Sequence, residues 1–503
     1  MAENKKKKEK EQVQKVESRK VLFPDLEQHI HLPARETKLL LADYDRAILC
    51  YQAQGFSDDQ IRERLSTDRL GGFYAHAALR WYALDPAEKL YPLGMRQGEM
   101  PLFRMSVYLK KQVIPELLQM ALNFVIKRFP SFATTVKSGV FWHYLDSTKR
   151  RFSIEAEKGV PCTPIHVAYS GSQVFRILYY QNRISVEFFH VVTDGTGGMI
   201  FLKTLAAEYI RLAEGVEAGT AAGRWPTPAE PGVWHPEDTP DECETANEFL
   251  KAEIFKGSSG FTGKPGVQLS GKLSRMKPCR ILHFEMSAAQ VKEKAHHYGG
   301  SITAYLLGIM FLAHKSATEE TGGPVIIQVP VNIRKYHPSV TLRNDSMYAM
   351  IALELGEITT LEEIVPKITQ QLVEKGAKEP MDKMVSTAVK MVASLKPIPR
   401  FIKRPVAEKL YGFLGDRLIS DTLSNMGVVR MPEEDVPYIE KFDFVLGPSV
   451  INRAACAMVT FGDHMVFSVT KTTVEPSFEE RIEKLLNQDE VQLKITGSPL
   501  YEY

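Results

Sequence analysis

A long segment rich in proline and glycine, residues 214–275, divides this chain into two parts. Five prolines between Pro226 and Pro240, and the sequence Gly257-Ser258-Ser259-Gly260, disfavour regular elements there. On both sides of it, some stretches alternate apolar and polar residues and others repeat apolar residues at helical spacing. The chain has 503 residues, enough for several compact units. We therefore expect an α/β (mixed α+β) protein of two lobes joined by a crossover.

The composition changes along the chain give five segments. Helical spacing over 38–53 and a capping box that begins at Ser57 predict helices in the second of them. The segments are a disordered basic tail (1–20), a helical N-terminal extension (21–84), an N-terminal lobe (85–213), a crossover linker (214–275) and a C-terminal lobe (276–503).

Charge and cysteine content exclude some classes of protein. The formal net charge is only +2, so no global field favours nucleic acid as a partner. The five cysteines are far apart and form no Cys-x-x-Cys pair, which is typical of a reducing, cytoplasmic protein. No secretory signal follows Met1, and no apolar stretch approaches the roughly 20 residues of a transmembrane helix. The histidine pairs His29-x-His31 and His296-His297 lack further ligands at useful spacing, so we expect no metal.

One strand–turn–helix unit carries residues suited to acid–base chemistry. The alternating stretch 184–189 predicts a strand that leads directly into His190, and 199–212 predicts the helix that follows. A histidine at such a strand end can act as a general base. Asp194 lies four residues further on, and Gly195 allows a tight bend and leaves space beside the ring. Alone, His-x-x-x-Asp-Gly is short enough to arise by chance.

The residues around His190 extend the pattern. The segment 188–195, FFHVVTDG, resembles the His-His-x-x-x-Asp-Gly signature of a large acyltransferase superfamily. Its members include chloramphenicol acetyltransferase, the condensation domains of peptide synthetases, the plant BAHD-like acyltransferases and the alcohol acetyltransferases. The base of the signature is its second histidine, which aligns with His190, whereas Phe189 replaces the first.

Other segments resemble the same superfamily in the same order. The resemblance covers roughly residues 85–490 and is strongest to the alcohol-acetyltransferase-like branch. The plant branch's Asp-Phe-Gly-Trp-Gly motif is absent, although Phe442–Gly447 lies near its place. The supporting segments are Phe129-Pro130-Ser131-Phe132, Val329-Pro330-Val331-Asn332-Ile333-Arg334, Leu342-Arg343-Asn344 and Ser424-Asn425-Met426-Gly427.

This resemblance implies an architecture and a set of roles. Two chloramphenicol-acetyltransferase-like lobes would meet in a V around a channel, with His190 midway as the general base. Asp194 would pair with a structural arginine, for which Arg334 and Arg453 are both candidates. The residues that could donate to the oxyanion or contact substrate are Ser424, Asn425, Thr193 and Thr196.

The expected activity is transfer of an acetyl or longer acyl group from acyl-CoA to a small-molecule alcohol or amine, with O-acylation favoured over N-acylation. Acyl-CoA would be a co-substrate, and no tightly bound cofactor is expected. Two alternatives stay open: a condensation-type enzyme that takes its acyl group from an acyl carrier protein, and a non-catalytic binding protein of the same fold. A monomer suffices, because two lobes of one chain already form the channel.

Overall fold

The computed structural model describes most of the chain. The described residues are 18–75, 81–86, 88–89, 91–93, 100–165, 173–216, 264–275, 278–339, 341–399, 402–403, 419–447 and 453–498. The expected basic tail lies almost wholly outside the described residues, as does most of the expected crossover linker.

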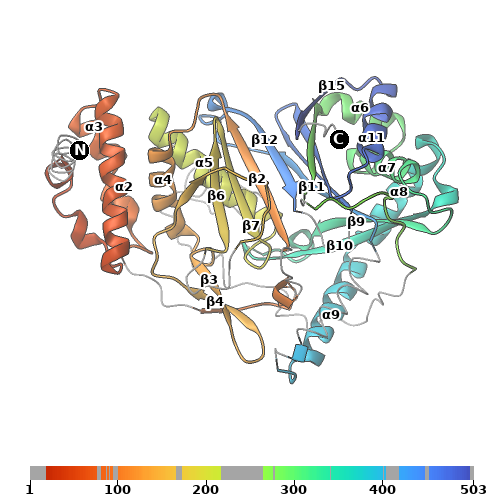
Figure 1. The fold of residues 1–503 in the computed structure, drawn as a ribbon, viewed down its shortest axis with the longest axis horizontal. Coiled ribbons are helices and arrows are strands. Elements are labelled where there is room, and N and C mark those ends of the chain that lie inside the picture. Colours follow the sequence, from red (N-terminus) through yellow and green to blue (C-terminus); the bar gives the residue numbers. More distant parts are fainter. Residues whose placement is uncertain are drawn as a thin grey trace.

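The N-terminal lobe is built on a five-stranded sheet of order β12-β2-β7-β6-β5 (Figure 1). Its strands pair antiparallel, except β5 with β6, which are parallel. The strands are β2 (Leu102–Leu109), β5 (Ile154–Ala156), β6 (Phe175–Tyr180), β7 (Arg183–Phe189) and β12 (Ile439–Leu446).

Helices cover one face of this sheet because the apolar side chains on that face must be buried away from water. The helices α4 (Pro115–Val125) and α5 (Gly195–Glu214) pack on each other and on the sheet. Phenylalanines fill the space between: Phe188 of β7 lies edge-on to Phe132 and Phe201, which stack on each other. Such contacts bury large apolar areas and favour edge or offset geometry.

The N-terminal extension is helical and packs on the outer side of α4, away from the other lobe (Figure 1). It contains α2 (Ala34–Ala53) and α3 (Asp58–Arg64), and the predicted capping box is confirmed, since Ser57 and Gln60 bond reciprocally. Buried Asp43 of α2 accepts hydrogen bonds from Asn123 and Arg151 of the lobe. The extension therefore shares the core of the N-terminal lobe.

Part of the expected extension is not helical. The strand β1 (Trp81–Ala83) pairs with β4 (His143–Ser147), which pairs with β3 (Thr134–Ser138) to form a small sheet of the N-terminal lobe.

The C-terminal lobe has a seven-stranded sheet of order β10-β9-β11-β13-β14-β8-β15. The strands β11 and β13 are parallel, and β14 and β8 pair antiparallel beside them. The strands are β8 (Arg280–Ser287), β9 (Pro324–Asn332), β10 (Ser346–Glu354), β11 (Asp421–Val429), β13 (Ala454–Phe461), β14 (His464–Lys471) and β15 (Leu493–Gly497). The helices are α6 (Ala288–His297), α7 (Ile302–Ser316), α8 (Leu361–Lys375), α9 (Lys378–Leu395) and α11 (Ser477–Gln488).

The mixed α/β class with two sheet-based lobes agrees with the expectation from sequence, but one element lies elsewhere. We expected all of 276–503 in the C-terminal lobe, whereas β12 pairs along its length with β2 of the N-terminal lobe. The physical reason is that β7 pairs with only one edge of β2. The backbone N–H and C=O groups along the other edge of β2 need partners, and β12 supplies them. This strand also lies against β13 and β14, so it belongs to the contact between the lobes.

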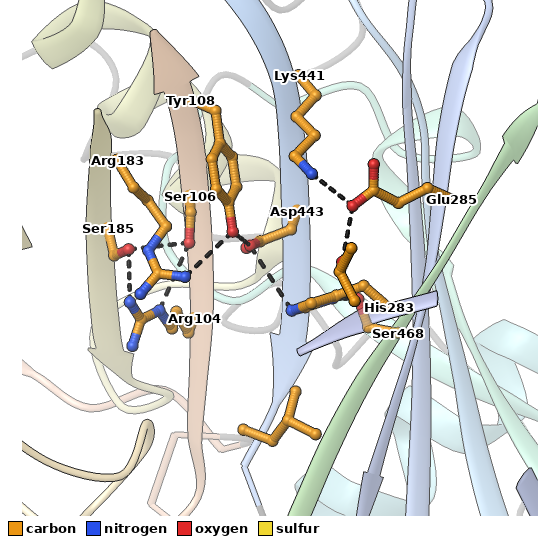
Figure 2. A network of polar contacts seen from close by, with 12 residues as sticks. Arg104, Ser106, Tyr108, Arg183, Ser185, His283, Glu285, Lys441, Asp443 and Ser468 are labelled. Atoms are coloured by element: carbon orange, nitrogen blue, oxygen red, sulfur yellow. Dashed lines mark hydrogen bonds and ion pairs between the residues drawn. The ribbon is translucent and has the colours of Figure 1, made fainter. Parts of the chain in front are cut away.

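A buried polar network fills the seam between the two sheets (Figure 2). On β12, Asp443 accepts a hydrogen bond from the Tyr108 hydroxyl at 2.7 Å, and that hydroxyl also accepts one from Arg183 at 3.1 Å. Across the seam, Lys441 donates to Glu285 of β8 at 2.5 Å. Burial alone would raise the pKa of Asp443, but nearby His283, Arg183 and Arg104 outweigh it and lower the pKa.

Ser468, His283 and Asp443 follow one another in this network in the order of a catalytic triad. The hydroxyl of Ser468 lies 2.9 Å from His283 Nδ1, but His283 Nε2 is 3.9 Å from Asp443, beyond hydrogen-bond range. Ser468 is only 1% exposed, in the middle of a paired strand. We therefore interpret these residues as part of the seam between the lobes.

Removing the carboxylate at the centre of the seam should destabilise the protein. We expect Asp443→Ala to cost about 1–3 kcal/mol of unfolding free energy, because the buried Tyr108 hydroxyl loses its acceptor, whereas Arg183 and Arg104 keep Glu157 as a partner. Denaturant unfolding measures the effect. As a control, Glu63→Ala on the exposed face of α3 should stay within about 0.5 kcal/mol of wild type. Equal stability of the two variants would show that the seam contributes little.

Candidate active site

His190 lies where the N-terminal lobe meets the C-terminal lobe. It directly follows β7, and its backbone N–H donates to the Pro101 carbonyl at 3.0 Å. The next residues, Val191 and Val192, are fully buried and anchor the turn in the core. The helix α5 then begins at Gly195, so a strand end and a helix start fix the two sides of this short turn.

The glycines of this turn allow a close approach between the lobes. A Cβ on Gly195 would lie 2.7 Å from the sulfur of Met426 in β11. A Cβ on Gly197 would lie 2.1 Å from the Leu342 carbonyl oxygen, a backbone atom that cannot move aside easily. Gly197 therefore lies too close to the Leu342 backbone for any side chain, whereas a side chain at Gly195 would have to displace that of Met426.

Asp194 ties this turn to the C-terminal lobe. Its side chain caps α5 by accepting from the Gly197 N–H at 3.0 Å. The other carboxylate oxygen pairs with Arg334 at 2.6 Å and accepts from the Asp345 N–H at 2.9 Å. Both side chains of the ion pair are almost wholly buried, at 1% exposure for Arg334 and 4% for Asp194.

The geometry distinguishes the two arginines that the sequence left open. Arg334 contacts Asp194 and also donates to the carbonyls of Thr341 and Arg343. In contrast, Arg453 donates to the Leu269 and Gly271 carbonyls. The partner of Asp194 is therefore Arg334.

Asn344 fixes the tautomer of His190. The Asn344 amide nitrogen donates to the His190 main-chain carbonyl at 2.7 Å, so its amide oxygen is the atom that faces Nδ1, also at 2.7 Å. An amide oxygen only accepts, so Nδ1 carries the proton in the neutral ring. The lone pair is then on Nε2, which makes no hydrogen bond to any residue that the structure describes.

The surroundings of His190 also keep its ring neutral. Burial lowers the pKa of His190 below its ordinary value of 6.5, and the negative charge of Asp194 opposes this shift only in part. A neutral imidazole with its lone pair on Nε2 can accept a proton at neutral pH.

The four residues expected near an oxyanion differ in their surroundings. The hydroxyl of Thr193 already donates to the Leu342 carbonyl at 2.6 Å. Asn425 donates to Thr303 at 2.9 Å, and Thr196 accepts a long hydrogen bond of 3.4 Å from Asn332. Ser424 is 9% exposed and lies on β11, two residues before the Met426 that approaches Gly195.

Sequence reasoning missed the aromatic surroundings of His190. The ring of Tyr91 stacks on the imidazole at 4.7 Å between centroids, and Phe103 meets it edge-on at 5.1 Å. Tyr348 of β10 lies beyond, 3.3 Å from the Tyr91 hydroxyl. Tyr91 is outside every motif and far from His190 in sequence, so no spacing signal could reveal it.

The described residues contain neither a candidate metal site nor a candidate membrane-spanning helix. No cluster of three or more His, Cys, Asp or Glu that could hold a metal ion occurs among them. None of the helices in the described part of the chain is long and apolar enough to cross a membrane.

Comparison with known proteins shows the fold. No family model and no curated protein sequence matches the chain, but solved structures do. Polyketide synthase associated protein 5 from Mycobacterium tuberculosis matches with a TM-score of 0.53 at 13% identity, over 81% of this chain and 96% of its own. The trichothecene 15-O-acetyltransferase TRI3 from Fusarium sporotrichioides matches with a TM-score of 0.52 at 12% identity, over 81% and 94%.

A starter condensation domain of rhizomide synthetase also matches, with a TM-score of 0.50 at 11% identity over 82% of this chain and 94% of that one. The chain thus has the two-lobed α/β fold that condensation domains share with this acetyltransferase.

The buried ion pair gives a testable prediction. Asp194→Asn preserves shape and helix capping but leaves buried Arg334 with only the more distant carboxylate of Asp345, 3.7 Å away. We expect a loss of about 3 kcal/mol or more in unfolding free energy, measured by denaturant titration. The control is Arg453→Gln, whose partners are carbonyls far from Asp194 in sequence and which should cost clearly less. A stable Asp194→Asn variant would contradict a structural role for the pair.

Proposed function

We propose that this protein is an acyltransferase that moves an acetyl or longer acyl group from acyl-CoA to a small-molecule acceptor. We favour a hydroxyl group over an amine as the acceptor. His190 Nε2 takes the proton of the acceptor as its oxygen or nitrogen attacks the thioester carbonyl. The carbon–sulfur bond then breaks, and the imidazolium returns the proton to the departing thiolate. The products are an ester or amide and free CoA thiol.

The observation that carries this proposal is the orientation of the His190 ring. Asn344 holds Nδ1–H and so directs the lone pair to Nε2, on a ring whose pKa burial has lowered. Most buried ring nitrogens have a hydrogen-bond partner, so the distinctive feature here is that Nε2 is left without a bond to any described residue and keeps its lone pair for the substrate.

The fold and the position of the turn support the same chemistry. The acetyltransferase with this fold acts, by its name, on an oxygen, and the rhizomide synthetase domain was crystallised with C8-CoA and Leu-SNAC. In this chain His190 lies between two lobes, so a donor and an acceptor would approach it from different sides. Asp194 and Arg334 would act by holding the turn and would not touch substrate.

Ser424 and Thr196 are the residues we favour as donors to the oxyanion. Thr193 donates its only hydroxyl hydrogen to the Leu342 carbonyl, and Asn425 donates to Thr303. Among the described residues, Thr196 only accepts a hydrogen bond and the Ser424 side chain makes none, so both keep a hydrogen to donate. Removal of one oxyanion donor typically lowers the rate by roughly two to three orders of magnitude.

The first test is loss of the base. We expect wild type to release thiol from acetyl-CoA or longer acyl-CoAs in the presence of alcohols or amines. His190→Ala should be roughly 10²- to 10⁴-fold slower, because general-base catalysis contributes about this much. The control is His296→Ala, at an exposed histidine of α6, which should keep full activity.

Two results would change this proposal. Equal rates for wild type and His190→Ala would mean that His190 is not the base. No turnover of any CoA thioester would direct attention to thioesters on an acyl carrier protein, and failure there to a binding role.

The pH dependence follows from the lowered pKa of His190. Only the neutral ring is a base, and its pKa lies below 6.5. As the pH is lowered, kcat/KM should therefore stay constant down to pH 6.5 and should fall only below that value. A pH–rate profile between pH 4.5 and 8.5 with a saturating donor measures the acid limb. An acid limb above pH 6.5 would contradict the lowered pKa of His190.

A further inference from the structure

A short segment before the N-terminal sheet reaches the imidazole of His190. It carries Asp85, Glu88 and Tyr91, and we call it the strap. The strap follows β1 and ends in a 3-10 turn, Tyr91–Leu93. The rings of Tyr91 and His190 lie 20° from parallel, with centroids 4.7 Å apart.

Three contacts together define the plane of the imidazole. Tyr91 covers one face, Phe103 contacts the ring edge-on, and Asn344 holds Nδ1. A stacked ring adds what a single hydrogen bond cannot supply, because it limits rotation of the imidazole about the Nδ1–oxygen direction.

The strap is fastened by a buried ion pair. The Glu88 carboxylate is wholly buried and accepts two hydrogen bonds from Arg343, one of them at 2.9 Å from Nε. Asp85 and Glu88 also bond reciprocally, each backbone N–H donating to the other's carboxylate at 2.9 and 2.7 Å. A bidentate contact between an arginine and a carboxylate fixes both the distance between the two groups and their relative orientation.

Arg343 lies in the loop that holds the catalytic turn. Its neighbour Leu342 accepts the hydrogen bond of Thr193, and its other neighbour, Asn344, holds His190. The strap is thus anchored to the same loop as the histidine that it covers. The second anchor is the Tyr348 hydroxyl of β10, 3.3 Å from that of Tyr91.

We propose that Tyr91 is a positioning residue for His190, held against the imidazole face by the strap, where it fixes the ring plane and keeps water from that face. This inference rests on the proposed role of His190 as the general base. It adds a residue that none of the sequence motifs contains.

The charges around the ring decide the direction of the expected pKa change. The titratable groups that face it are Asp194 at the start of α5 and the hydroxyls of Tyr91 and Tyr348; Arg334 neutralises Asp194. Removal of the Tyr91 ring lets water reach His190, which raises its pKa, and removes a π face, which lowers it. Burial is the largest contribution to the lowered pKa of His190, so we expect the rise to win.

The experiment compares Tyr91→Ala, Tyr91→Leu and Tyr91→Phe with wild type in the full-length chain. The His190 pKa is read from NMR titration of labelled histidines, with His190→Ala to assign the signal. Tyr91→Ala should raise this pKa and lower kcat by roughly 10- to 100-fold, with KM changed far less. Tyr91→Phe keeps the ring and should retain both values, and Tyr180→Ala, at a half-exposed tyrosine, is the control.

The outcomes separate this inference from the proposed function. The NMR titration needs no turnover, so an inactive wild type still tests the stacking. An unchanged or lower His190 pKa in Tyr91→Ala overturns the inference, even where His190→Ala abolishes activity. If Tyr91→Ala does not fold, Tyr91→Leu decides: a bulky side chain without a flat face should lower kcat, and full activity would overturn the positioning role.

Discussion

The buried ion pair between Asp194 and Arg334 is the constraint on which the rest of the site depends. It joins the start of α5 in one lobe to the 3-10 turn Ile333–Lys335 that follows β9 in the other. Two charges out of water are tolerated only when their remaining hydrogen bonds are satisfied. Here the carboxylate also caps a helix, and the guanidinium also binds two carbonyls. A change at either residue would therefore disturb the turn that carries His190.

The loop 341–345 receives most of these contacts. Thr341 and Arg343 offer carbonyls to Arg334, Asn344 binds His190, and the Asp345 N–H donates to Asp194. Each contact joins the loop to the turn at a different atom. Several independent contacts therefore fix the orientation of the His190 imidazole. The site is assembled by the meeting of two lobes, and the hydrogen bond from Lys441 of β12 to Glu285 of β8 joins the same two sheets at the seam.

Local signals predicted the elements, and a motif singled out His190, the centre of the candidate site. Alternation gave β7, and capping chemistry gave the start of α3 at Ser57. Long-range facts were not accessible in this way. The pairing of β12 with β2 depends on which sheet edge is open, and the stacking of Tyr91 on His190 depends on the path of an irregular segment. Neither feature produces a periodic pattern in the sequence. The sequence also does not show that Arg334, and not Arg453, is the partner of Asp194, which depends on the distance between the side chains.

The choice of an amide as the partner of His190 has a chemical consequence. A carboxylate at the position of Asn344 would stabilise the imidazolium and raise the pKa of the ring. The Asn344 amide selects the same tautomer with no charge, and burial can then lower the pKa of His190. The nearest charge, Asp194, is compensated by Arg334. A base with a low pKa is neutral over a wide pH range, and its conjugate acid returns a proton readily to a departing thiolate. The same geometry thus suits both halves of an acyl transfer from a thioester.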